Sequence, residues 1–313
     1  MVRLGLAVGS AAFLLGRIPQ DSPKYSVAAV YDQSNFFDNF DFFSDPDPTH
    51  GFVQYVDAET ANRYGLAGFS DGGIYLGVDH TNVTQTGRPS VRVVSKTSFT
   101  RGVFVADIAH MPAGTGKGGS CGLWPAFWTV GPNWPASGEI DIIEGVNNQL
   151  ADVVTLHTAP GCSVANEGSV SSTTLRSSDC QGNAGCSQDT AATYGAAFNE
   201  IGGGTYIVEW SAEAISVWFF PRNGPPVPDL ETVDGGSGSG LAALGTPLAR
   251  FVGAACDFRQ NFKNHSIVFN TDFCGDFCSG LGSTCEQYVG QNPDAFANAY
   301  WLINSIKVLT PSS

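Results

Sequence analysis

The sequence predicts an all-β protein in which two antiparallel sheets pack as a sandwich. Of the 313 residues, 38 are Gly and 17 are Pro, and such frequent interruption is typical of short strands joined by tight turns. No window of useful length shows apolar residues at the helical positions i, i+3, i+4 and i+7. Hydrophobic residues make up 42% and charged residues 14%, so a long disordered polyelectrolyte is excluded.

Individual strands are predicted where short β-branched or aromatic runs lie between Gly, Pro, Asn or Ser. We expect strands at residues 73–78, 90–94, 102–108, 205–210, 215–220, 267–270 and 299–309. The glycine-rich segments 202–204 and 235–240 do not join a strand to a helix, as a phosphate-binding loop would, and are interpreted as surface loops. No internal repeat or linker is evident after Tyr25. We therefore expect a single domain over residues 29–313, preceded by a leader at residues 1–28.

The N-terminus and the cysteines indicate export. Arg3 is followed by an apolar run that ends before Arg17, which has the length of a signal peptide and is too short to span a bilayer. The eight cysteines lack zinc-ligand spacing, so we expect up to four disulfides, without assigning their pairing. Possible glycosylation sites at Asn82 and Asn264 agree with a secreted, extracellular or cell-wall protein.

The charge balance limits the partners. Fifteen Lys and Arg residues against 29 Asp and Glu residues give a formal net charge of −14. Phosphate backbones and anionic lipids would repel such a chain, so we expect no nucleic-acid and no membrane partner. A neutral ligand is easier to accommodate.

One segment carries the chemistry, at residues 137–147. Glu139, Asp141 and Glu144 lie among isoleucines, where an apolar run would otherwise form a buried strand. A solvated edge strand and a calcium site are the alternative interpretations. In a flat strand Glu139 and Asp141 would share one face and Glu144 would point to the other. A β-bulge at Ile142-Ile143 would return Glu144 to the face of the other two.

This geometry predicts a pair of catalytic carboxyl groups. With the bulge, two glutamates leaning toward each other would bring their carboxyl groups to roughly 5 Å, close to the ~5–5.5 Å of a retaining glycosidase. One glutamate would then be the nucleophile and the other the general acid. Asp141 between them would share a proton and orient the nucleophile.

The bulged pattern E-I-D-I-I-E, preceded by Trp134-Pro135 and Gly138, resembles the active-site strand of glycoside hydrolase family 16. It is most similar to the laminarinase branch, the endo-1,3(4)-β-glucanases, in their fungal secreted form. The resemblance runs from about Tyr31 to Leu309. Further similar segments are residues 47–51, 55–57, 87–88, 90–92, 121–128, 155–158, 218–222, 273–276 and 295–301.

The resemblance implies a β-jelly-roll sandwich with a substrate cleft across its concave sheet. It also implies that Glu139 is the nucleophile, Asp141 its helper and Glu144 the acid/base of a retaining mechanism. No cofactor and no catalytic metal are expected. Some relatives carry a structural calcium ion away from the cleft, but the sequence contains no signal for one.

Substrate-binding residues are predicted from their chemistry and from the resemblance. Tryptophans stack on the apolar faces of sugar rings, while Arg, Asn and His bond hydroxyl groups. The candidates are Trp124, Trp134, Trp128, His157, Arg92, Asn270 and Tyr55. Core packing is the alternative for each tryptophan and is preferred for Trp210, Trp218 and Trp301. A core histidine and an ion pair are the alternatives for His157 and Arg92.

The sequence therefore predicts a secreted, monomeric endo-β-glucanase that acts on β-1,3-glucan and mixed-linkage β-1,3-1,4-glucan, with β-glucan polysaccharide as its partner. Two alternatives remain open. A non-catalytic β-glucan-binding module is disfavoured by the intact glutamates. A cell-wall transglycosylase is disfavoured by the bulged motif, because those branches generally show the shorter pattern E-x-D-x-E.

Overall fold

A computed structural model describes residues 25–115, 121–228, 230, 241–278 and 283–312. Most of the predicted leader and the predicted loop at 235–240 lie outside the described residues. Residues 25–28, which the prediction placed in the leader, belong to a strand that runs from Tyr25 to Tyr31. The position of the leader boundary stays a prediction. None of the helices in the described part is long and apolar enough to cross a membrane.

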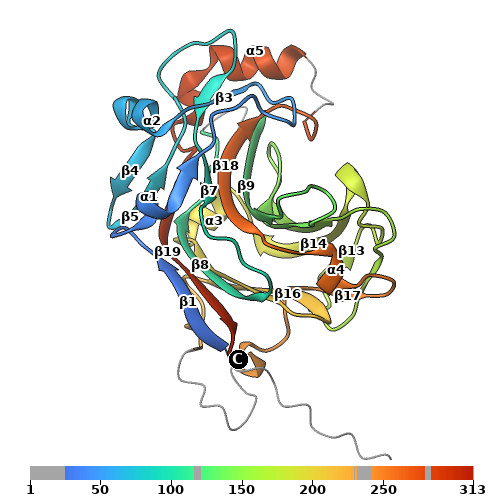
Figure 1. Cartoon of the computed structure of the whole chain (residues 1–313). Helices are drawn as coiled ribbons and strands as arrows, with labels where there is room; N and C mark the ends of the chain where they lie inside the picture. Colours follow the sequence, from blue (N-terminus) through green and yellow to red (C-terminus); the bar gives the residue numbers. More distant parts are fainter. Residues whose placement is uncertain (1–24, 116–120, 229, 231–240, 279–282, 313) are drawn as a thin grey trace, which may run out of the picture.

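Two antiparallel sheets face each other as a sandwich, as predicted (Figure 1). The eight-stranded sheet has the strand order β13 (Thr174–Leu175), β14 (Cys186–Thr193), β11 (Ala151–His157), β10 (Glu139–Glu144), β9 (Leu123–Val130), β18 (Ser266–Phe273), β7 (Arg92–Ser95) and β2 (Phe40–Phe42). The predicted catalytic strand β10 is therefore an interior strand, hydrogen-bonded to β9 and β11. An interior position excludes the alternative of a solvated edge strand.

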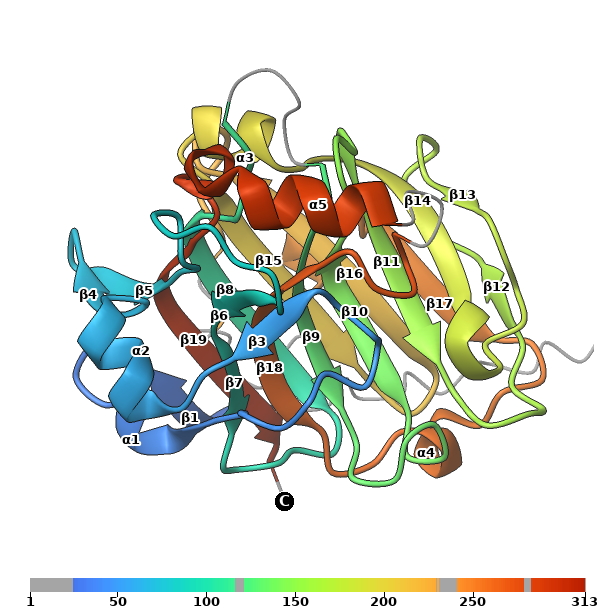
Figure 2. The same cartoon turned by 90° about the horizontal axis from the view of Figure 1, so that it is seen from above.

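The nine-stranded sheet covers the other side of the core (Figure 2). Its order is β12 (Val164–Asn166), β17 (Ala249–Gly253), β16 (Ala214–Pro221), β15 (Gly204–Trp210), β8 (Gly102–His110), β19 (Trp301–Pro311), β5 (Gly73–Leu76) and β4 (Ala67–Ser70), with β1 (Tyr25–Tyr31) also paired to β19. A separate two-stranded ribbon of β3 (Val53–Tyr55) and β6 (Arg88–Ser90) is parallel.

The core between the sheets follows the two-residue alternation of the strands. Ile140 and Ile143 of β10 are 1% exposed and pack in the same apolar cluster as Tyr206 and Trp210 of β15. Trp210, Trp218 and Trp301 are buried, as the sequence predicted. The carboxylates of β10 are consequently left for the opposite face of its sheet.

Two features of the chain differ from the sequence expectations. The predicted strand at 90–94 is divided at Val91, because Ser90 pairs with Tyr55 of β3 whereas Arg92 pairs with Asn270 of β18. Short helices also occur, although no helical periodicity was found. They are α1 (Phe36–Asn39), α2 (Ala58–Tyr64), α3 (Ala196–Glu200), α4 (Phe258–Asn261) and α5 (Ser283–Gln291).

The helix α2 shows why such short helices have no helical periodicity in the sequence. Its seven residues make fewer than two full turns with a single buried side chain, Ala61, so no apolar stripe can form. Its ends are specified instead by caps. The Asp57 carboxylate accepts a hydrogen bond from the N–H of Thr60, and Gly65 ends the helix at a φ of 66°.

Three disulfides connect the loops around the sandwich. They join Cys162 to Cys256, Cys180 to Cys186, and Cys274 to Cys285. Cys121 and Cys278 are free thiols, so the described part of the chain has three of the up to four expected disulfides.

Candidate active site

The predicted β-bulge is present in β10. Glu139, Asp141 and Glu144 stand opposite Val130, Trp128 and Ala126 of β9, and the register shifts between Asp141 and Ile143. The three partners are two residues apart along β9 and so share one face. The bulge therefore places all three carboxylates on the face of the eight-stranded sheet that turns away from the core, which we call the acidic face.

Close packing defines where this strand begins. Gly138, immediately before β10, has a φ of 81°, and a Cβ there would lie 2.5 Å from the carbonyl oxygen of Asn261. Only glycine fits both the left-handed backbone and this contact. The segment around α4 can therefore lie directly against the entry to β10, which fixes the position of Glu139.

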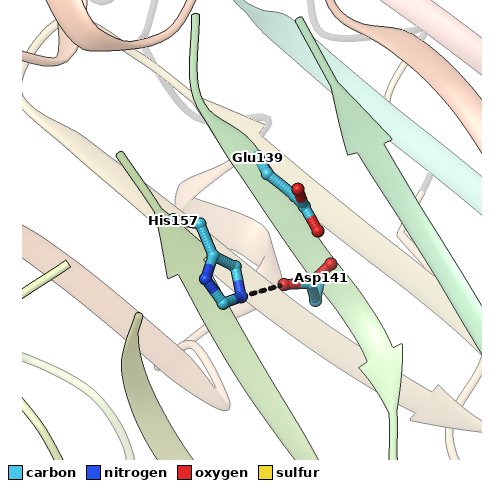
Figure 3. A group of neighbouring side chains, drawn as sticks. All are labelled: Glu139, Asp141 and His157. Atoms are coloured by element: carbon cyan, nitrogen blue, oxygen red, sulfur yellow. Dashed lines mark ion pairs between the residues drawn. The ribbon is translucent and has the colours of Figure 1, made fainter. Parts of the chain in front are cut away.

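His157 holds Asp141 from the neighbouring strand (Figure 3). Its Nε2 lies 3.1 Å from Oδ2 of Asp141, and the two side chains are nearly buried. Its other ring nitrogen, Nδ1, lies 2.7 Å from the carbonyl oxygen of Gly182. Because a carbonyl only accepts, Nδ1 carries a proton, and the ring orientation is set from both sides. The sequence predicted His157 as a substrate-binding residue, and in the structure it contacts Asp141.

The loop that supplies this carbonyl is short and closed. Cys180 and Cys186 form a disulfide six residues apart, and Gly182 lies between them. Gly185 has a φ of 59°, and a Cβ there would come within 2.8 Å of the His157 ring. The cysteines are evident in the sequence, but the contact between Gly182 and His157 is not, because Gly182 acts through its backbone and leaves no side-chain signal.

The buried charges shift one another's proton affinity. Burial would lower the pKa of His157, but the hydrogen bond and charge of Asp141, with a contribution from Glu139, raise it to about 10. His157 is therefore a cation near neutral pH. Burial, followed by the charge of Asp141, raises the pKa of Glu139 well above its usual range, while His157 lowers it. Hydrogen bonding with Asp141 also raises the pKa of Glu139.

The surroundings of Glu144 favour its protonated form. Burial, then the charge of Asp141, raises its pKa to about 8. The indole N–H of Trp124 donates a 3.0 Å hydrogen bond to Oε1 of Glu144, which lowers the pKa, as does His157. At neutral pH Glu144 is therefore mostly protonated.

A second group of predicted residues forms a hydrogen-bonded chain beside the carboxylates. The indole N–H of Trp128 donates to Oδ1 of Asn270 at 2.7 Å, and Nδ2 of Asn270 donates to the hydroxyl of Tyr55 at 3.0 Å. Asn270 is 7% exposed and Tyr55 4%. The structure thus places Trp128, Asn270 and Tyr55 together, with their polar atoms occupied by one another.

Arg92 joins the same group through its charge. Its Cζ lies 4.9 Å from the ring centre of Trp128 and 4.4 Å from that of Phe43. No carboxylate of the described residues forms an ion pair with Arg92, so cation–π contacts replace the ion pair that was the alternative interpretation. Phe43 was missed, because an isolated aromatic residue in a loop carries no sequence signal.

Of the other two candidate tryptophans, Trp124 contacts Glu144, whereas Trp134 lies in the loop that precedes β10. Trp124 bonds Glu144 directly, and its ring packs edge-on against Phe277 at 5.5 Å. Trp134 is 47% exposed and contributes an open aromatic surface. Among the described residues, no hydrogen bond joins Trp134 to the three carboxylates or to the group formed by Trp128, Asn270 and Tyr55.

Glu139, Asp141 and His157 also have the ligand types of a metal site. Their ligand atoms lie within 4.8 Å of one another. Asp141 and His157 already satisfy each other as an ion pair, and a protonated imidazole cannot bind a metal. The expectation of a metal-free reaction stays a prediction.

Comparison with known proteins shows close relatives along nearly the whole chain. Residues 40–309 match the family model described as XgeA-like, catalytic GH16 domain. The chain is 41% identical over 317 residues to an endo-1,3(4)-β-glucanase of Arthroderma benhamiae and 38% identical over 330 residues to endo-1,3(4)-β-glucanase XgeA of Emericella nidulans. These alignments cover 94% and 98% of this chain but 67% and 51% of the relatives, so the chain spans about half to two thirds of their length.

Two solved structures are similar throughout. One is an elongating GH family 16 β-1,3-glucosyltransferase, with a TM-score of 0.82, 40% identity, and coverage of 92% of this chain and 100% of that one. The other is Laminarinase 16A from Phanerochaete chrysosporium, with β-glucans in donor and acceptor sites. It has a TM-score of 0.81, 36% identity, and coverage of 91% of this chain and 99% of that one.

The His157–Asp141 pair predicts an imidazole that resists titration. In an NMR titration the His157 ring signals should stay in the protonated position up to a midpoint near pH 10. Asp141→Asn removes the main carboxylate partner and should lower that midpoint by more than about one unit. His265, buried with its pKa lowered to about 4, is the internal control and should be unchanged. A His157 midpoint near 6.5 in both proteins would refute the ion pair.

The Asn270 group predicts a measurable loss of stability. Asn270→Ala leaves the Trp128 indole N–H and the Tyr55 hydroxyl without their partner and should lower the free energy of unfolding by about 1–3 kcal/mol. Asn270→Asp keeps an acceptor for Trp128 and should lose less. Urea unfolding curves measure both. Equal stability of Asn270→Ala and the unaltered protein would show that these bonds contribute nothing.

Proposed function

Because the chain belongs to glycoside hydrolase family 16, with an XgeA-like catalytic domain over residues 40–309, we propose that it is a retaining endo-β-glucanase that hydrolyses β-1,3-glucan and mixed-linkage β-1,3-1,4-glucan. The observation that carries this proposal is the β-bulge that gathers Glu139, Asp141 and Glu144 on one face. The names of the relatives, endo-1,3(4)-β-glucanases at about 40% identity, support the substrate class.

The first chemical step assigns one function to each glutamate. Glu144 gives its proton to the glycosidic oxygen as that bond breaks, and the carboxylate of Glu139 attacks the anomeric carbon to form a glycosyl enzyme. We infer a separation of roughly 5 Å between the two carboxyl groups, which suits a retaining reaction. The raised pKa of Glu144, about 8, supports its assignment as the acid at neutral pH.

The second step returns the protein to its starting state. Glu144, now ionised, takes a proton from water while the water oxygen attacks the same carbon and releases Glu139. Because the second attack reverses the first inversion, the product keeps the β configuration.

Asp141 and His157 would together control whether the nucleophile, Glu139, carries a proton. The attack requires Glu139 as an anion, whereas burial and the charge of Asp141 favour its protonated form. The cationic His157 lies beyond Asp141 and lowers the pKa of Glu139. Its positive charge therefore favours the reactive form of the nucleophile.

Sugar binding would use the aromatic groups on either side. Trp124 is held against Glu144 and would stack on the sugar beside the bond that breaks, together with the exposed Trp134. Sugars further along the glucan would be bound by a second group of residues, Arg92, Trp128, Asn270 and Tyr55. We also propose that the protein is secreted and acts as a monomer on β-glucan without a cofactor. The three disulfides support an oxidising environment.

A second candidate is glucan elongation by transfer. The glucosyltransferase neighbour resembles the chain as closely as the laminarinase does, with TM-scores of 0.82 and 0.81. A transferase would use the same glycosyl enzyme but pass it to a sugar hydroxyl instead of water. The bulged motif therefore separates hydrolysis from transfer less well than the sequence alone indicated.

The substrate proposal predicts release of reducing sugar from laminarin and lichenan, and none from cellulose, xylan or agarose. Glu139→Gln should lose this activity by at least about 1,000-fold while laminarin still retards it in an affinity gel. Chromatography of laminaritetraose digests separates the candidates, since hydrolysis gives only shorter products and transfer gives longer ones. Treatment with EDTA should change neither result. Binding without any product from the unaltered protein would favour the binding module.

The mechanism predicts azide rescue of the acid/base variant. Glu144→Ala should turn over an aryl β-glucan oligosaccharide with a good leaving group only slowly, because no base activates water. Azide needs no base, so it should restore turnover and yield a β-glycosyl azide. Glu139→Gln is the matched control and should not respond. An α-glycosyl azide would contradict retention.

A further inference from the structure

A buried carboxylate behind the acidic face has no function in the mechanism described above. Asp152 lies in β11, where alternation along the strand places Val154 and Leu156 on the core side together with it. The residue is 0% exposed. A carboxylate at such a depth is costly unless its oxygens are hydrogen-bonded, so its partners indicate why it is there.

The first partner is the backbone of the acid/base. The β10–β11 pairing runs from Glu139 opposite His157 to Asp141 opposite Thr155 and then stops. Without the bulge this register would bring Glu144 opposite Asp152. Instead, the N–H of Glu144 donates a 3.1 Å hydrogen bond to Oδ1 of the Asp152 side chain. The carboxylate thus replaces the backbone acceptor that the bulge removes.

The second partner belongs to the other sheet. The hydroxyl of Tyr206, in β15, donates a 3.0 Å hydrogen bond to Oδ2 of Asp152. The backbone carbonyl of Asp152 accepts a further bond from the Thr190 hydroxyl at 2.8 Å. Asp152 therefore connects the nine-stranded sheet, through the core, to the backbone of Glu144.

We propose that Asp152 is a positioning residue of the reaction, which fixes the backbone of Glu144 from the core side of the sheet and places a second negative charge behind it. The inference rests on the proposed function, because it assigns Glu144 as the acid/base. According to this proposal, the geometry of the active site is determined by a residue of the core as well as by the residues of the acidic face.

The charge acts on Glu144 together with the other groups that face it. The charge of Asp152 raises the pKa of Glu144, in the same direction as burial and Asp141, whereas Trp124 and His157 lower it. The buried Tyr194 lies near both carboxylates and stays neutral, since burial raises its pKa well above 10. Removing the charge of Asp152 therefore lowers the pKa of Glu144.

The proton affinity of Asp152 itself falls in the working range. Burial raises its pKa to about 7, against the hydrogen bonds from Glu144 and Tyr206, which lower it. Tyr206 stays protonated, because burial and then Asp152 raise its pKa well above 10. Near pH 8, where Glu144 titrates, Asp152 is thus mostly ionised.

The test separates the hydrogen bond from the charge. Asp152→Asn keeps an oxygen for the Glu144 N–H but is neutral, whereas Asp152→Ala removes both. For Asp152→Asn we expect the basic limb of the kcat/KM profile on laminarin to move to lower pH by about 0.5–1 unit, with kcat at the optimum within about threefold. For Asp152→Ala we expect kcat to fall about tenfold or more with KM little changed, because the acid is misplaced rather than the substrate.

Two further variants check the direction and the location. Trp124→Phe removes the indole bond that lowers the pKa of Glu144 and should move the same limb to higher pH. Glu209→Gln is the matched control, because Glu209 in β15 also accepts a bond from a tyrosine hydroxyl, that of Tyr25 at 3.2 Å, but has no side-chain hydrogen bond to β10 among the described residues. Its profile should equal that of the unaltered protein.

Tyr206→Phe keeps the conclusion testable if Asp152 variants fail to fold. Loss of the tyrosine bond raises the pKa of Asp152, so less of its charge is present near pH 8 and the basic limb should shift in the same direction as for Asp152→Asn, but less. Thermal unfolding identifies misfolded variants. Folded Asp152→Asn or Tyr206→Phe with an unmoved basic limb would overturn the inference. Absence of any glucan product from the unaltered protein would instead overturn the proposed function.

Discussion

The active face of this protein depends on one extra residue in one strand. A regular strand offers every second side chain to each face, so E-I-D-I-I-E would divide its carboxylates between the core and the solvent side. The bulge between Asp141 and Ile143 lets Ile140 and Ile143 pack in the core while all three acids face outward. A strand at the centre of a sheet can thus serve stability and chemistry together.

The bulge also has a cost, which the surroundings offset. It interrupts the pairing of β10 with β11, and it concentrates like charges where burial raises their pKa values. The cation His157 compensates Asp141 on one side, and the indole of Trp124 bonds Glu144 on the other. Each of these partners is itself held in place, His157 by the carbonyl of Gly182. Such a layered arrangement restricts the carboxylates to one geometry.

The sequence predicted those features that alternation and side-chain chemistry determine. The two-sheet sandwich and the bulge follow from strand patterns and from the family resemblance. It could not predict contacts made through the backbone or across the core. The carbonyl of Gly182 leaves no side-chain signal, and Asp152 in the run Ala151–Val154 looks like any polar residue of a strand. The contact between His157 and Asp141 could not be predicted either, because neighbouring strands fix which residues face each other only once their register is known.

The same reasoning explains why family membership does not separate hydrolysis from transfer. Under the proposed mechanism, both reactions would need an ionised Glu139, a protonated Glu144 and the same glycosyl enzyme, so the three carboxylates would be under the same physical demands in either case. The outcome depends on whether water or a sugar hydroxyl reaches the anomeric carbon first. That competition is decided by the affinity of the surface that binds the acceptor, through stacking and hydroxyl bonds that differ by a few kcal/mol. Under the same proposal, exposed aromatic groups such as Trp134 and Phe277 would bear on the choice, whereas the geometry of the bulge would not.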